Sequence, residues 1–135
     1  MILQHEWMDV ERIVHLDLDS HPADGPRSSL GHSIGRFEGD TLVIETANYS
    51  EGVLSQYVEI PGQPTRGLLH SDALTSIERL RFDAATQQIE LTIELSDPVF
   101  FTRDFDPVSA RYAPSALEIE PFNCRPENPD HTLKE

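Results

Sequence analysis

The stretch Gln88–Leu95, QIELTIEL, alternates polar and aliphatic residues without a break. A period of two places every second side chain on the same face of a β-strand. The stretch therefore predicts a strand with one face on a core and the other in solvent. Elsewhere the sequence contains no amphipathic pattern of helical period and ordinary helix length, so the fold class that it predicts is all-β.

Further strands are expected where Val, Ile, Leu and Phe gather between residues that favour turns. These stretches are residues 12–18, 41–46, 76–82, 100–105 and 116–119. Short connections between the later strands predict antiparallel hairpins. We expect a single-domain antiparallel meander closed into a calycin- or lipocalin-like barrel, because closure removes exposed sheet edges. A two-sheet β-sandwich is the alternative.

One domain is expected over residues 1–135, because a chain of 135 residues can bury a core of its own. Residues 125–135 contain prolines and end in charged residues, and we expect them to form a flexible tail. Two long loops, at residues 20–30 and 52–67, are interpreted either as binding loops or as plain connections at the ends of the barrel.

The chain carries 24 acidic and 10 basic residues, a formal net charge of -14. Such a surface repels phosphate groups and argues against nucleic acid and anionic membranes as partners. Cys124 is the sole cysteine and no long apolar run is present, so we expect neither an intrachain disulfide nor a membrane span. The N-terminal residues do not resemble a signal peptide. The default expectation is a cytoplasmic protein, with a periplasmic one as the alternative.

The dipeptide Gly39-Asp40 is typical of a two-residue hairpin turn. This turn would place Arg36 opposite Val43, with His32 on the same face as Arg36. Arg36 and Glu45 would then be diagonal neighbours. We interpret them as a solvated ion pair, with a binding role for Arg36 as the alternative.

A second hairpin is predicted in which Glu78 faces Ile93. If the next strand ran through residues 100–105, Ile93 would in turn face Arg103. Glu78 and Arg103 would then share an apolar face, where a carboxylate must find a partner or become neutral. This face is a candidate binding site. Two alternatives stay open: a purely structural ion pair, or a register shift of one residue that turns both side chains to solvent.

The dipeptide His-Ser occurs twice, at His32-Ser33 and at His70-Ser71, and its imidazole and hydroxyl groups suggest acid/base chemistry. His70 and Asp72 are two residues apart, so the carboxylate could orient the imidazole. Ser33 and Ser71 are candidate nucleophiles, but no G-x-S-x-G elbow surrounds either serine. His32 and His70 could hold zinc or iron with a carboxylate, yet no close-spaced ligand motif supports this, and we assign no metal ligand. The remaining histidines are interpreted as structural or disordered: His5, His15, His21 and His131.

Three motifs resemble a bacterial β-domain family of uncharacterised function: GHSIGRFEGDTLVIET from Gly31, LHSDALTSIERLRFD from Leu69 and LSDPVFFTRDF from Leu95. The resemblance extends over residues 12–124. It implies that the following residues belong to the family pattern, without implying a reaction: His32, Ser33, Arg36, Glu38, Gly39, Asp40, His70, Ser71, Asp72, Glu78, Arg79 and Arg103.

The chain departs from that pattern at several positions. Phe37 replaces a tryptophan, Glu45 replaces an aspartate, and Arg103-Asp104-Phe105 stands where the pattern has arginine, proline and an aromatic residue. The segment 49–65 is also longer than the pattern leads us to expect.

We expect the mouth of the barrel to hold a small, largely apolar molecule. The function that the sequence favours is a cofactor-independent acid/base enzyme of the isomerase, cyclase, lyase or hydratase type. Its expected catalytic residues are His70, Asp72, Glu78 and Arg103. Its expected ligand contacts are His32, Ser33, Arg36, Tyr57, Ser71, Phe101 and Phe105. The alternatives are a non-catalytic binding barrel, a metal-dependent enzyme and a structural or interaction domain, and a homodimer is left open.

Overall fold

The structure, a computed structural model, describes residues 1–58 and 66–122, except for the side chains of Trp7, residues 55–58 and Arg66. The described chain is all-β, as predicted. The strands of the larger sheet are β1 (Ile2–His5), β2 (Val10–His15), β3 (His32–Glu38), β4 (Thr41–Ala47), β7 (Thr75–Asp83), β8 (Gln88–Ser96) and β9 (Val108–Tyr112). A smaller sheet contains β5 (Gly52–Val58) and β6 (Arg66–His70), and a 3-10 turn, η1 (Trp7–Asp9), connects β1 to β2.

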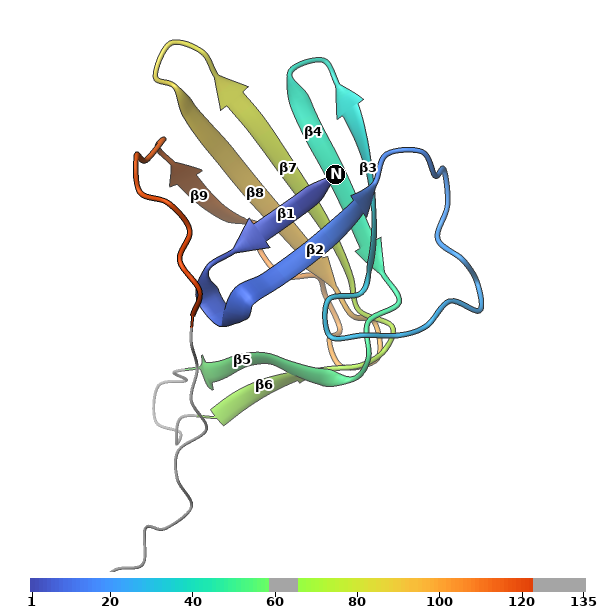
Figure 1. Ribbon diagram of the computed structural model, residues 1–135. Helices are drawn as coiled ribbons and strands as arrows, with labels where there is room; N and C mark the ends of the chain where they lie inside the picture. The colour runs from blue at the N-terminus through green and yellow to red at the C-terminus, as the bar shows by residue number, and fades with distance from the viewer. Residues whose placement is uncertain (59–65, 123–135) are drawn as a thin grey trace, which may run out of the picture.

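The larger sheet has seven strands in the order β1-β2-β3-β4-β7-β8-β9 and curls into a half-barrel (Figure 1). The β5–β6 hairpin lies at one end of this half-barrel (Figure 1). After β9 the chain continues to η1, where the backbone N–H of Phe122 donates to Asp9 Oδ1 at 2.8 Å. Residues 113–122 therefore link the β9 side of the sheet to the β1–β2 side. The predicted tail, residues 125–135, lies outside the described residues.

Both hairpins predicted from the sequence are confirmed in register. Arg36 pairs with Val43 across the turn at Gly39, which has a positive φ of 64°. Glu78 pairs with Ile93 in the β7–β8 hairpin. Turn residues and alternation were sufficient to define these pairings because both connections are short.

The prediction of a strand at residues 100–105 is wrong. Strand β8 ends at Ser96, and the chain turns there because Asp97 Oδ1 accepts hydrogen bonds from the backbone N–H groups of Val99 and Phe100. The next strand is β9, in which Val108 and not Arg103 pairs with Ile93. The strand expected at residues 116–119 is also absent, since those described residues are in no strand.

The antiparallel prediction fails for one pair of strands. Strands β2 and β3 pair in parallel at two positions, Val14 with Ser33 and His15 with Ile34, after a connection of residues 16–31. The predicted sequence of hairpins also missed β1 and the β5–β6 hairpin, which falls in the expected loop at residues 52–67.

The core lies on the concave face of the sheet, under the β1–β2 pair. Val14, Leu42 and Ile44 form its buried cluster, with Leu3 and Leu80 packed against them. Burying such side chains contributes roughly 1.5–3 kcal/mol each, so this cluster fixes how β1 and β2 cross the sheet.

Gly35 permits the close crossing of β2 over β3. A Cβ atom at Gly35 would lie 2.7 Å from Val14 Cγ1 and 3.0 Å from Leu16 Cδ2, so a side chain could not be accommodated without movement of its neighbours.

The convex face of the sheet carries cross-strand ion pairs. These pairs are Arg36–Glu45, Arg79–Glu94, Arg81–Glu90 and Arg111–Glu90. The predicted Arg36–Glu45 pair is thus confirmed as an exposed surface contact. Pairs of this kind contribute little stability individually, but they leave the convex face solvated and charged.

Candidate functional site

A layer of buried and partly buried polar side chains crosses one end of the half-barrel, and we call it the polar layer. Its members are Ser33, Thr46, Tyr49, His70, Ser71, Ser76 and Asp97. Ser33 Oγ and Thr46 Oγ1 are 2.8 Å apart, and the Tyr49 hydroxyl lies 2.8 Å from Ser76 Oγ. Strand pairing places Thr46 beside Ser76, which connects the two hydroxyl pairs.

Asp97 anchors the polar layer at the end of β8. Its carboxylate, only 1% exposed, accepts hydrogen bonds from the Ser71 backbone N–H at 2.6 Å and the Ser71 hydroxyl at 2.8 Å. Burial raises its pKa, but the hydrogen bonds from Ser71, Phe100 and Val99 outweigh this effect and hold the pKa below its ordinary value. Asp97 was missed as a site residue, although its position before Pro98 was a recognisable turn signal.

His70 is buried at the end of β6, but Asp72 does not orient it. His70 Nδ1 lies 3.0 Å from the Ser71 carbonyl oxygen, and its ring meets the Tyr49 ring edge-on at a centroid distance of 6.0 Å. Asp72 is exposed and lies near Arg27, with 3.5 Å between Arg27 Nη2 and Asp72 Oδ2. The expected orientation fails because β6 ends at His70, so the strand alternation does not extend to Asp72.

Glu78 lies on the concave face as predicted, but its partner is Arg12. Arg12 Nη1 is 2.6 Å from Glu78 Oε2, and the two side chains are 16% and 14% exposed. Neither Arg12 Nε nor Glu78 Oε2 makes an aligned hydrogen bond within the described part of the chain. The predicted Glu78–Arg103 pair was wrong because residues 100–105 do not continue the sheet.

Residues 101–107 form a loop beside the open end of the β7–β8 hairpin, where β7 begins and β8 ends. Arg103 is exposed on this loop, and the rings of Phe101 and Phe105 meet edge-on at a centroid distance of 4.5 Å. Between the loop and the sheet is a groove of about 240 Å³, lined by Thr75, Ile77, Glu94, Leu95, Ser96, Asp104, Phe105 and Pro107. Thr75, Ile77 and Glu94 come from the convex face of the strands. Among the expected ligand contacts whose side chains the structure describes, Phe105 is the one that lines this groove.

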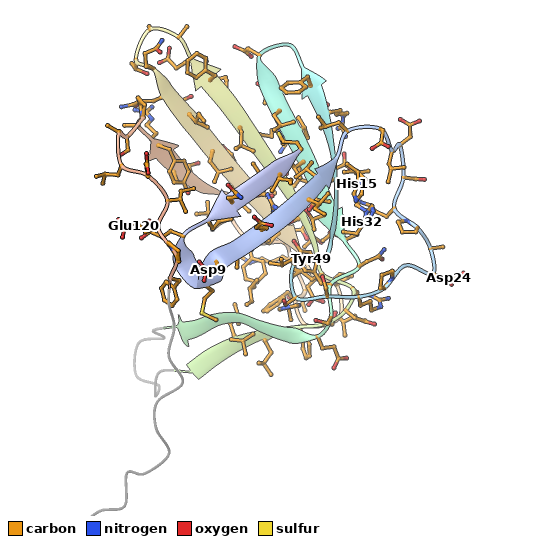
Figure 2. The ribbon with its side chains drawn as sticks, viewed as in Figure 1. Asp9, His15, Asp24, His32, Tyr49 and Glu120 are labelled. Carbon is orange, nitrogen blue, oxygen red and sulfur yellow. The ribbon has the colours of Figure 1, made fainter. Side chains whose placement is uncertain are left out.

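Three histidines from different segments of the chain also lie close together in the structure. His15 at the end of β2 stacks on His32 at the start of β3, with ring centroids 4.8 Å apart and planes within 10° (Figure 2). His21, in the connection between these strands, places its Nδ1 2.9 Å from His32 Nδ1. The sequence did not reveal this cluster, because it depends on the path of the 16–31 connection.

The other expected ligand contacts are spread over the molecule. Ser33 and Ser71 are buried in the polar layer, and Arg36 is exposed on the convex face between Glu38 and Glu45. Tyr57 belongs to β5, but its side chain lies outside the described residues. The predicted residues whose side chains are described therefore do not surround one common point.

Within residues 1–58 and 66–122, no group of three or more His, Cys, Asp or Glu side chains is arranged to hold a metal ion. No helix in the same described ranges is long and apolar enough to cross a membrane. Comparison of the chain with protein-family models, with curated proteins and with solved structures gave no match. The resemblance to a bacterial β-domain family therefore stays a prediction.

Proposed function

We propose that the protein binds a small molecule with an apolar body and a positively charged head, in the groove between the convex face and the 101–107 loop. One observation carries this proposal: apolar side chains and carboxylates line the same groove of about 240 Å³. Ligand sites combine mostly apolar walls with a few polar groups that fix orientation. A volume of about 240 Å³, just below the usual range of roughly 300–1,000 Å³, suits a small molecule with a single ring.

The apolar walls come from both sides of the groove. Ile77 belongs to the sheet, whereas Phe105 and Pro107 belong to the loop. Phe101 packs edge-on against Phe105 and thereby supports its ring. This arrangement favours a planar or compact apolar ligand body.

The polar lining favours a cation over an anion. Glu94 already pairs with Arg79 at 2.6 Å, while Asp104 forms no ion pair among the described residues. Thr75 and Ser96 add hydroxyl groups to the lining. The net charge of -14 strengthens the attraction for cations at low ionic strength. A primary amine would find a carboxylate and hydroxyl acceptors in the same groove.

We propose binding without chemical conversion because the expected catalytic residues are not brought together. Proton-transfer catalysis by His70 is a second proposal, supported by its burial beside Tyr49. The sequence led us to expect a ligand in a calycin-like barrel mouth. A calycin-type relationship remains our proposal for the fold, supported by the curled antiparallel strands β3, β4, β7, β8 and β9.

Nuclear magnetic resonance titration with benzylamine tests the proposed groove, with benzyl alcohol and phenylacetate as neutral and anionic comparisons. We expect backbone amide shifts confined to residues 75–77, 94–96 and 104–106, and a dissociation constant on the order of 1 mM, in keeping with such a small ligand. Phenylacetate should not bind. Chemical analysis of the recovered ligand would show whether any conversion occurs.

Two variants locate the ligand within the groove. Phe105→Ala should weaken benzylamine binding at least fivefold, whereas Phe100→Ala, a control on the same connection outside the groove, should leave it unchanged. Asp104→Asn should remove the preference for benzylamine over benzyl alcohol. Shifts elsewhere in the protein, or equal binding by Phe105→Ala and the unaltered protein, would contradict the proposal.

A further inference from the structure

Three imidazoles from three segments meet at one side of the sheet. Figure 2 shows His15 and His32 next to each other beside the connection that carries Asp24 at its far end. His15 stacks on one side of His32, and His21 meets His32 edge-on at a centroid distance of 5.2 Å. His21 comes from the 16–31 connection, so the cluster joins this connection to the ends of both neighbouring strands.

The contact between His21 and His32 depends on the number of protons that they hold. Their Nδ1 atoms are 2.9 Å apart, a separation that requires one N–H donor and one lone-pair acceptor. If both rings become imidazolium ions, two N–H groups face each other and no acceptor remains. A charged His15 stacked on His32 would add a second repulsion.

The first part of the connection relies on this contact. Besides His21, it is held to the sheet through Pro22, whose carbonyl oxygen accepts a hydrogen bond from Asn48 Nδ2 at 3.0 Å. The second part is held in another way: Arg27 Nη1 donates to the Asp72 carbonyl oxygen at 2.6 Å, and Ser50 N–H donates to the Ser28 carbonyl oxygen at 2.8 Å. The groups that form these last two hydrogen bonds, a guanidinium, two backbone carbonyls and a backbone N–H, keep the same protonation state between pH 5 and 8.

We propose that the three histidines form a pH-sensitive latch, which releases residues 17–21 from the sheet when the solution becomes mildly acidic. Residues 25–31 stay attached through Arg27 and Ser28, so the release is local. The latch is closed when one of the two facing nitrogens carries a proton and the other does not.

The charges around the latch support this direction of response. Burial lowers the pKa of His32 below its ordinary value of 6.5, and the charges of His15 and His21 lower it further. Ala47, the β4 residue opposite His32, is uncharged, and along the same face Arg36 is paired with Glu45. Because the released state binds protons more readily, the closed state loses stability as the pH falls below about 6.5.

Backbone relaxation measured by nuclear magnetic resonance at pH 7.5 and pH 5.0 tests the latch. We expect the squared order parameter of residues 17–21 to fall from near 0.85 to below about 0.6 at the lower pH, while β7 and β8 stay rigid. His21→Ala should show the mobile values at both pH values. His5→Gln, a control at an exposed histidine of β1, should keep the pH response.

Three results would overturn the latch. Residues 17–21 could show equal order at both pH values, or order could fall equally throughout the sheet, which would indicate general acid unfolding. The third result is a pH response that persists in His21→Ala. Nitrogen shifts of the imidazoles, followed in the same samples, report directly whether protonation of His21 and His32 accompanies the loss of order.

Discussion

At the scale of single residues, Asp97 shows how one carboxylate organises several segments. Its carboxylate accepts hydrogen bonds from Ser71, which directly follows β6, and from the backbone N–H groups of Val99 and Phe100 in the turn after β8. Asp97 thereby connects the end of β6 to the end of β8. A buried carboxylate is costly unless its oxygens are satisfied, and here each oxygen accepts at least one hydrogen bond. The residue type alone identified a turn at Asp97-Pro98, but the contact with Ser71 spans 26 residues and had no sequence signal.

Asp97→Asn should lower the free energy of unfolding by about 2–4 kcal/mol, measured by urea denaturation at pH 7. The amide must direct its NH₂ group at one set of N–H or O–H donors, so at least one buried donor loses its acceptor. Asp83→Asn is the matched control: Asp83 caps an exposed turn through Ala85 and Thr86, and its loss should lower the free energy of unfolding much less than Asp97→Asn does.

The pH dependence of the two proteins provides a check on the same residue. Because the pKa of Asp97 is held below its ordinary value of 3.8, its contribution is complete above that pH and is lost as the pH falls through the lowered value. The unaltered protein and Asp97→Asn should therefore differ in stability most at neutral pH and converge in strong acid. A constant difference at all pH values would show that the charge of Asp97 is not involved.

At the scale of elements, the pairing of strands joined by short connections could be predicted from the sequence, whereas the pairing of strands joined by long connections could not. The β3–β4 and β7–β8 registers followed from turn residues and alternation, since a short loop allows few pairings. The partner of Glu78 could not be predicted in the same way. Glu78 needed a cationic partner on its face, but β2 supplies Arg12 only because this strand crosses the sheet before Val14 and His15 pair in parallel with β3.

The Arg12–Glu78 contact should behave as a brace between β2 and β7. In a double-mutant cycle with Arg12→Ala and Glu78→Ala, we expect a coupling energy of about 1–3 kcal/mol, because the pair lies on the apolar concave face and each single change leaves a charge without its partner. The cycle of Arg36→Ala and Glu45→Ala, on the exposed convex face, should give a clearly smaller coupling energy. Equal coupling in both cycles would contradict a bracing role for Arg12.

At the scale of the whole molecule, the half-barrel carries two different faces. Apolar residues gather on the concave face beneath β1 and β2, whereas ion pairs cross the convex face. This division was predictable from alternation. The position of the groove was not, since it arises from the 101–107 loop lying against strands β7 and β8, a contact that strand patterns do not encode.

The excess of acidic residues should make the folded protein more stable in salt. A compact chain with a net charge of -14 repels itself, and raising NaCl from 10 to 300 mM shortens the screening length from about 30 Å to less than 8 Å. Screening also weakens the exposed ion pairs, but each of these contributes only about 0–1 kcal/mol. We therefore expect the unfolding temperature at pH 7.5 to rise by several degrees, measured by circular dichroism.

KCl at equal concentration should produce the same rise, because screening depends on ionic strength and not on the identity of the monovalent cation. An unfolding temperature that stays level or falls would mean that the convex ion pairs outweigh the self-repulsion of the chain. The same salt series should weaken benzylamine binding, since the field that stabilises the cation is the field that destabilises the fold. Stability and cation affinity should therefore change in opposite directions as salt is added.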